Sequence, residues 1–77
     1  MVGEDLKRFR LRAGRTASDV ASLAGVSERT VLRWEGGASV PSASRLRSLR
    51  VAYAMTVSES LRMGPLLRGG LATGGEI

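Results

Sequence analysis

The sequence predicts an all-α fold, a compact bundle of five short helices followed by a glycine-rich C-terminal tail. Apolar residues recur three and four positions apart through most of the chain, which is the spacing of one buried helix face. Serine or threonine precedes several of these stretches, where its hydroxyl can cap a helix N-terminus. Glycine or proline interrupts the pattern between them. With 77 residues the chain is expected to form one domain with a thin core, since a domain of this size buries only about 60% of its unfolded surface.

The first helix is expected at residues 4–13. It opens with two acidic residues, which suit the positive end of a helix dipole. Leu6, Phe9 and Ala13 follow at helical spacing and should face the core. Gly14 is a common residue just after a helix C-terminus, so the helix should end there.

The second helix is expected at residues 17–24, with Thr16 as its N-cap and Asp19 in a weak version of a capping box. Gly25 can adopt the positive φ of a sharp turn without a Cβ clash. Ser27 can cap a third helix at residues 28–36. Apolar residues that should hold this pair of helices to the bundle are Val20, Ala21, Ala24, Val26, Val31 and Trp34.

Two further helices are expected after the loop at residues 36–42, at 43–54 and 57–63. Ser42 should cap the former, which buries Leu46, Leu49, Ala52 and Tyr53 and leaves Arg45, Arg47 and Arg50 outside. Thr56 and Glu59 form a capping box for the latter, whose apolar residues are Val57 and Leu61. Residues 64–77 are expected to be a flexible tail, or one ordered only by a partner, because glycine is frequent there.

Composition argues against an enzyme. The chain contains no cysteine and no histidine, which excludes disulfides, the usual zinc ligands, thiol nucleophiles and the commonest general base. A small core also leaves little room for an internal active site. No cofactor, metal or small-molecule ligand is therefore expected.

The charge favours a phosphate-bearing partner. Twelve basic residues against seven acidic ones give a net charge of +5 and a pI near 11.4, and every basic residue except Lys7 is arginine. The guanidinium fork donates two hydrogen bonds to one phosphate. The alternative is a solvated basic surface with no special partner. No apolar run is long enough to span a bilayer, and the first residues lack the apolar core of a signal peptide, so a cytoplasmic protein without membrane contact is expected.

Two short helices joined by a glycine turn, the second with a polar outer face, form a helix-turn-helix at residues 17–36. The chain also resembles the Cro and phage-repressor type of helix-turn-helix domain, often called Xre-like, over roughly residues 6–61. The stretches that carry the resemblance are "LKRFRLRAGRT", "AGVSERTVLRWEGG", the following Pro41 and "TVSESL". The resemblance implies a lambda-repressor-like five-helix domain at residues 1–63. It also implies a sequence-specific regulator that places residues 28–36 in the DNA major groove.

The resemblance and the groove chemistry together assign candidate DNA contacts. The residues expected to read bases are Glu28, Arg29, Leu32 and Arg33. The residues expected to bind phosphates are Arg15, Thr16, Ala17, Ser27, Thr30, Gly37, Ser39, Ser42 and Arg45. The family usually has glutamine where this chain has Ala17, so that contact should be weaker or be replaced by Arg15.

Other interpretations of these residues remain open. Glu28 can be a solvated acid that favours the helix dipole, and Leu32 can be exposed or packed on a second subunit. The outward arginines of residues 43–54 can be an ordinary solvated face. Arg10 and Glu35 match a pair that, in the family, ties the first helix to the end of the third, and Trp34 is interpreted as core rather than as a base-stacking surface.

The leading hypothesis is a DNA-binding transcriptional regulator of a phage or mobile element, which binds a near-palindromic operator as a homodimer in the cytoplasm, associated with the nucleoid. The alternative is a helical protein-interaction module, antirepressor-like or antitoxin-like, that masks a protein partner. Leu23 favours the alternative, because it lies where the second helix is usually polar. With Leu66, Leu67 and Leu71 it suggests a protein-binding patch.

Overall fold

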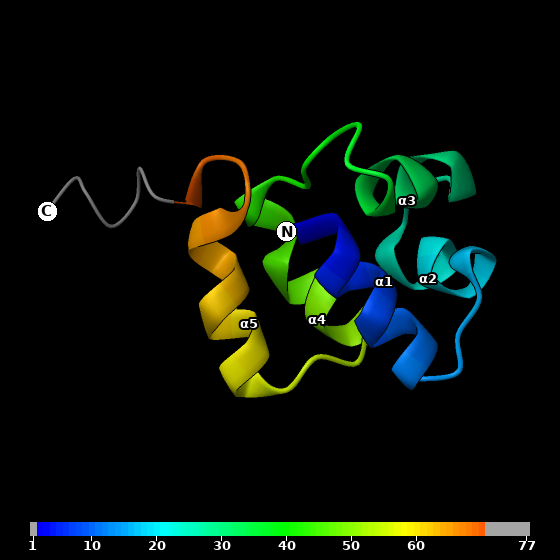
Figure 1. Ribbon diagram of the computed structural model, residues 1–77, viewed down its shortest axis with the longest axis horizontal. Helices are drawn as coiled ribbons and strands as arrows, with labels where there is room; N and C mark the ends of the chain where they lie inside the picture. Colours follow the sequence, from blue (N-terminus) through cyan, green and yellow to red (C-terminus); the bar gives the residue numbers. More distant parts are fainter. Residues whose placement is uncertain (1, 71–77) are drawn as a thin grey trace, which may run out of the picture.

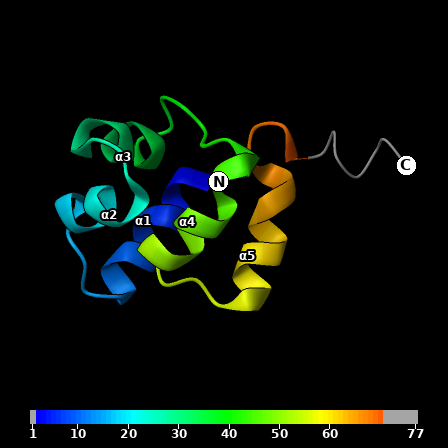
Figure 2. The same cartoon turned by 180° about the vertical axis from the view of Figure 1, so that it is seen from behind.

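The computed structural model describes residues 2–70, which fold into five α-helices and two short 3₁₀ turns with no strand (Figure 1). The elements in chain order are α1 (Val2–Arg12), α2 (Ala17–Ala24), α3 (Glu28–Glu35), η1 (Ala43–Arg45), α4 (Leu46–Ala52), α5 (Val57–Met63) and η2 (Gly64–Leu66). In both views α2 and α3 lie at one end of the molecule and α5 at the other, with α1 and α4 between them (Figures 1 and 2). The predicted all-α, five-helix architecture is confirmed.

The helix α1 begins two residues before its expected start, and this brings its backbone against the end of α3. A Cβ atom added to Gly3 would lie 2.6 Å from the carbonyl oxygen of Trp34 and 2.8 Å from that of Glu35. Only glycine fits at so close an approach. The helix ends at Arg12, one residue before its expected end, so Ala13 lies in the following turn and is only partly buried. The amide of Arg15 donates to the carbonyl of Arg10 (3.1 Å) around Gly14, which has a φ of +70°.

The helix-turn-helix pair has the caps that the sequence predicted. The amide of Asp19 donates to Thr16 Oγ1 (3.0 Å), and the amide of Thr16 donates to the Asp19 carboxylate (2.9 Å), which completes the capping box of α2. Gly25 has a φ of +72°, and Ser27 Oγ accepts the amide of Thr30 (3.1 Å) at the start of α3. These local bonds fix where each helix begins and how the chain turns between them.

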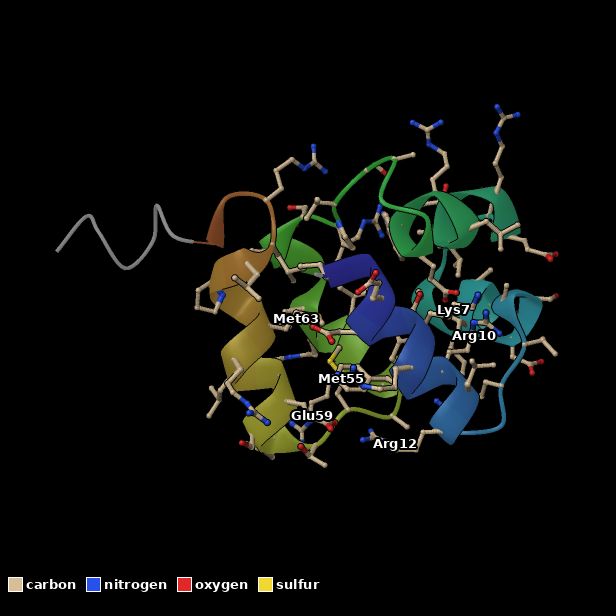
Figure 3. The ribbon with its side chains drawn as sticks, viewed as in Figure 1. Lys7, Arg10, Arg12, Met55, Glu59 and Met63 are labelled. Carbon is tan, nitrogen blue, oxygen red and sulfur yellow. The ribbon has the colours of Figure 1, made fainter. Side chains whose placement is uncertain are left out.

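One thin apolar core joins the helices. The buried apolar residues are Leu6, Phe9, Ala17, Val20, Ala21, Ala24, Val31, Trp34, Leu49, Ala52, Tyr53, Met55, Met63 and Leu67. All the inward residues expected for α2 and α3 are among them except Val26, which is partly buried against the same core. Met55 and Met63 lie between α5 and the rest of the bundle (Figure 3).

The apolar residues named for α5 lie on the molecular surface and not in the core. The bounds of this helix are those predicted, but Val57 and Leu61 are 54% and 70% exposed, and Ser60 and Met63 are buried instead. The Ser60 hydroxyl donates to the carbonyl of Val57 (2.8 Å), so this polar side chain can be buried without losing a hydrogen bond. The apolar residues of α5 therefore remain on the molecular surface.

The helix expected at residues 43–54 is divided. Its first turn is the 3₁₀ turn η1, in which Ser42 Oγ accepts the amide of Ser44 (3.3 Å), and α4 begins only at Leu46. Leu49 is fully buried as expected, and Leu46 is partly buried. After α4 the chain reverses through Ala54, a non-glycine residue with a φ of +53°.

The packed domain extends beyond residue 63, where the sequence placed its end. Leu67 is only 3% exposed, and Arg68 forms a parallel bridge with Ser42. The remainder of the expected tail, including Leu71, lies outside the described residues. Within residues 2–70, no helix combines the length and the apolar character that crossing a membrane requires.

An ion pair between Arg12 and Glu59 ties the end of α1 to the first turn of α5 (Figure 3). The two guanidinium nitrogens donate to the two carboxylate oxygens at 2.7 and 2.9 Å, and one of them also donates to the carbonyl of Ala54 (3.0 Å). The hydrogen bond from Arg12 is the largest cause that lowers the pKa of Glu59 from 4.5 to about 2, and the amide of Thr56 lowers it further.

We expect Gly3→Ala to lower the free energy of unfolding by about 1–3 kcal/mol, because the new methyl group must displace the last turn of α3. Urea unfolding followed by the fluorescence of Trp34 measures this. Glu4→Ala, on the exposed side of the same turn, is the control and should change stability by less than about 0.5 kcal/mol. Equal stability of Gly3→Ala and the unaltered chain would contradict the close packing of α1 on α3.

We expect the free energy of unfolding to fall as the pH is lowered from about 5 toward 2. Because the pKa of Glu59 is depressed in the folded state, its contribution is present above 4.5 and is lost as the pH falls through about 2. Glu59→Gln keeps a residue that suits the capping box and removes the titration, so its stability should depend less on pH in this range. Identical pH profiles for the two proteins, measured by thermal unfolding, would rule out this contribution.

Candidate nucleic-acid interface

The helix α3 is amphipathic and is attached to the bundle along one side only. Val31 and Trp34 are 0% and 4% exposed and anchor it to the core. The candidate base-reading residues, Glu28, Arg29, Leu32 and Arg33, are all exposed to solvent. Long side chains that end in nitrogen project from α3 away from the bundle (Figure 3). The DNA major groove is about 12 Å wide and admits an α-helix, whose diameter with side chains is about 10–12 Å.

The last residue of α3 is held by two other helices. Arg10 of α1 donates from Nε to Oε2 (2.9 Å) and from Nη2 to Oε1 (2.9 Å) of Glu35. The hydroxyl of Tyr53, which follows α4, donates to the same Oε2 (3.0 Å). The Arg10 and Glu35 side chains are only 12% and 4% exposed. The ion pair expected from the sequence is thus present, with Tyr53 as a third member that the sequence interpretation treated only as core.

The ionisation states of this cluster are fixed by its own contacts. The hydrogen bond to Glu35 is the main cause that raises the pKa of Arg10, against the opposing effect of burial. Burial is the main cause that raises the pKa of Tyr53, and the negative charge of Glu35 raises it further. Arg10 therefore stays charged and Tyr53 stays neutral, and both remain hydrogen-bond donors to the carboxylate.

An open cleft of about 660 Å³ lies beside α3, and it brings together four of the nine expected phosphate-binding residues. Its lining residues are Thr30, Trp34, Ser39, Val40, Pro41, Ser42, Arg45, Leu66 and Arg68. Thr30, Ser39, Ser42 and Arg45 were expected from the sequence. Arg68 was not, because nothing in the local sequence pattern indicates that the residues after α5 return to the loop between α3 and η1.

The other phosphate candidates lie outside this cleft lining. The Thr16 hydroxyl accepts the Asp19 amide, and Ala17, the first residue of α2, is 9% exposed. Ser27 is the N-cap of α3, and its hydroxyl is 3.0 Å from that of Thr30. Gly37 is exposed in the loop after α3. Their roles toward DNA remain predictions.

Arg15 is hydrogen-bonded to the end of α4. Its Nη1 donates to the carbonyl oxygens of Val51 (2.7 Å) and Ala52 (2.8 Å), at the C-terminal end of α4. This arginine therefore satisfies carbonyl groups that the helix itself leaves unpaired. Its role toward DNA, and the expectation that it replaces the glutamine missing at Ala17, remain predictions.

The described residues contain no cluster of three potential metal ligands. The site does contain cationic groups without an ionic partner in this part of the chain. Arg29, Arg33, Arg45 and Arg68 form no ion pair within residues 2–70. The arrangement is suited to binding an anionic surface by hydrogen bonds and charge.

Comparison with protein families finds that a family model described as "Helix-turn-helix domain", of the Xre/Cro-like type, matches residues 2–62. No curated protein and no solved structure matches the chain. The matched residues include all five helices except the last residue of α5.

We expect Tyr53→Phe to lower the free energy of unfolding by about 1.5–3 kcal/mol, because it removes a hydrogen bond to a charged, nearly buried carboxylate. The unaltered chain should also lose stability above about pH 10, where tyrosine ionises in the unfolded chain while its raised pKa keeps Tyr53 neutral in the fold. Tyr53 is the single tyrosine, so the variant should lack this alkaline loss. Urea unfolding at pH 7 and pH 11 measures both effects, and an alkaline loss of equal size in the variant would contradict the assignment.

Proposed function

The chain belongs to the helix-turn-helix domain family, and on this premise we propose that it is a sequence-specific transcriptional regulator, not an enzyme, that binds double-stranded DNA. The observation that supports the proposal most directly is the orientation of α3. Val31 and Trp34 hold one side of this helix in the core, while Arg29 and Arg33 on its exposed surface have no ionic partner within residues 2–70. A surface of this kind meets the requirements of a recognition helix.

Base reading in this proposal rests on four side chains of α3. Arg29 and Arg33 are four residues apart, so they lie one above the other on the helix and can each donate two hydrogen bonds to guanine O6 and N7. Glu28 can accept from cytosine N4. Leu32 is 52% exposed and can contact a thymine methyl group. One good contact contributes about 1–3 kcal/mol of discrimination, so a few suffice for a half-site.

Phosphate contacts in this proposal come from the cleft beside α3. Thr30, Ser39, Ser42 and Arg45 line it and offer three hydroxyls and one guanidinium. A duplex that receives α3 in its major groove brings a phosphate backbone alongside the same helix. The further contacts proposed are the Ala17 amide, the Thr16 and Ser27 hydroxyls, Arg15 and the loop at Gly37.

The biological setting proposed is that of a Cro-like or repressor-like protein of a phage or mobile element, acting in the cytoplasm on the nucleoid. Two copies on a near-palindromic operator would place their α3 helices about 34 Å apart, in successive major grooves on one side of the duplex. The alternative of a protein-masking module keeps two supporting observations, the exposure of Leu23 (48%) and of Leu66 (59%). It loses another, because Leu67 is buried in the core.

We expect Arg29→Ala and Arg33→Ala each to weaken binding at particular base pairs, at a cost of about 1–3 kcal/mol for the preferred site. Arg45→Ala should weaken binding to all sequences about equally. Selection of bound sites from random DNA, repeated with each variant, measures these preferences and the symmetry of the site.

The matched control is Arg50→Ala, which removes an equal charge from an exposed position of α4 that lines a different depression of the surface. It should change affinity much less than the other three. A uniform loss across all sequences for Arg29→Ala and Arg33→Ala would contradict base reading by α3. Absence of DNA binding even at low salt would favour the protein-masking module.

A further inference from the structure

We propose that Arg68, which follows α5, is a phosphate contact of the DNA interface, held in place by backbone pairing with the loop between α3 and η1. This inference rests on the proposed function and adds a segment to it. The family model ends at residue 62, and Arg68 lies beyond it, so this contact belongs to the chain's own continuation. The C-terminal segment then forms part of the DNA-binding surface.

The backbone on both sides of Arg68 is fixed. Its amide donates to the carbonyl of Pro41 (3.0 Å), and its carbonyl accepts the amide of Ala43 (2.9 Å), which forms the parallel bridge with Ser42. Both bonds join the C-terminal segment to the wall of the cleft. Because they are made by the main chain, they are independent of the Arg68 side chain.

The direction of the side chain follows from that of its neighbour. Leu67 has an extended backbone, with φ of −80° and ψ of 159°, and successive side chains of an extended chain point to opposite sides. Leu67 is buried in the core, at 3% exposure, so Arg68 faces outward. It lines the cleft together with Arg45 and Thr30.

The chemistry of the cleft selects an oxyanion. Two guanidinium groups and three hydroxyls line it, and no acidic residue does. Neither guanidinium forms an ion pair or a hydrogen bond within the described residues, whereas those of Arg8, Arg10, Arg12 and Arg15 all do. Arginine pairs on hydroxyl-lined surfaces suit phosphate, which accepts several charge-assisted hydrogen bonds at once.

The position of the cleft favours DNA as the source of this phosphate. Thr30 and Trp34 of α3 form one of its walls, so any duplex seated on α3 lies next to it. The cleft is open rather than enclosed, as a surface that receives a long polymer must be. A free phosphate ion is the other source, and the experiment separates the two.

The test is the salt dependence of DNA affinity for the full chain and for Arg68→Gln. Each phosphate neutralised on duplex DNA contributes about 0.9 to the slope of log affinity against log salt. The slope of the variant should therefore be smaller by about 0.9. If the two proteins bind equally at 1 M salt, the variant should bind roughly fivefold more weakly than the unaltered chain at 0.15 M, and equally so for all sequences. Arg68→Lys keeps the charge and should restore most of the slope.

Arg62→Gln is the matched control, since it removes the same charge from an exposed position of α5 that lines a separate depression with Asp5 and Glu59. Its slope should equal that of the unaltered chain. Equal melting temperatures of Arg68→Gln and the unaltered chain would show that the main-chain pairing persists.

Three outcomes would overturn the inference. An unchanged slope for Arg68→Gln, while the unaltered chain binds DNA, removes the Arg68 contact and leaves the proposed function standing. Absence of DNA binding by the unaltered chain removes both. Titration with inorganic phosphate, followed through the amide signals of Ser39, Ser42 and Arg68, tests the other source: submillimolar binding together with an unchanged DNA slope would identify a free-anion site instead.

Discussion

The orientation of α3 depends on the hydrogen bonds that Arg10 and Tyr53 donate to the carboxylate of Glu35. A helix of eight residues is unstable on its own. Two buried apolar side chains alone leave it free to rotate slightly about its long axis. The carboxylate at its last residue accepts hydrogen bonds from α1 and from the residue after α4, which locks the remaining freedom. A nearly buried ion pair adds little net stability, because desolvation offsets its attraction. Its contribution is geometric: it sets the angle at which Arg29 and Arg33 leave the bundle.

Most arginines of this chain fall into two groups by what they bind. Those of α1 and the following turn donate to protein acceptors: Arg8 to Asp5, Arg10 to Glu35, Arg12 to Glu59 and Arg15 to carbonyls of α4. Those of α3 and the adjacent cleft form no ion pair within residues 2–70. The first group therefore builds the scaffold of a domain that has little core. The second group places four guanidinium groups on and beside the exposed side of α3, whereas Arg47, Arg50 and Arg62, which belong to neither group, are exposed on α4 and α5.

Sequence reasoning succeeded where a feature is decided within about four residues. The capping boxes of Thr16 and Thr56, the turn at Gly25 and the buried pair Val31 and Trp34 are such features, and the structure has them all. It failed where the outcome depends on contacts distant in the chain. Ser60 and Met63 are buried because that side of α5 faces the rest of the bundle, and Arg15 donates to the carbonyl of Val51, 36 residues further along the chain. Neither fact leaves a mark in the local pattern. The local pattern also does not indicate the cleft, because Leu66 and Arg68, which follow α5, form part of its lining.

The pairing of Arg68 with residues 41–43 joins the loop after α3 to the segment after α5. The sequence analysis expected that segment to be a tail outside the domain. Main-chain bonds hold the segment to the loop, and Leu67 anchors it in the core beneath. Any anion that binds across Arg45 and Arg68 contacts both sides of this junction, so it favours the paired state over a state in which the segment has separated. Linkage is reciprocal: whatever stabilises the docked segment must also strengthen anion binding in the cleft, by the same factor. In the function proposed above, the C-terminal segment therefore changes the affinity for phosphate, and the base reading proposed for α3 does not depend on it.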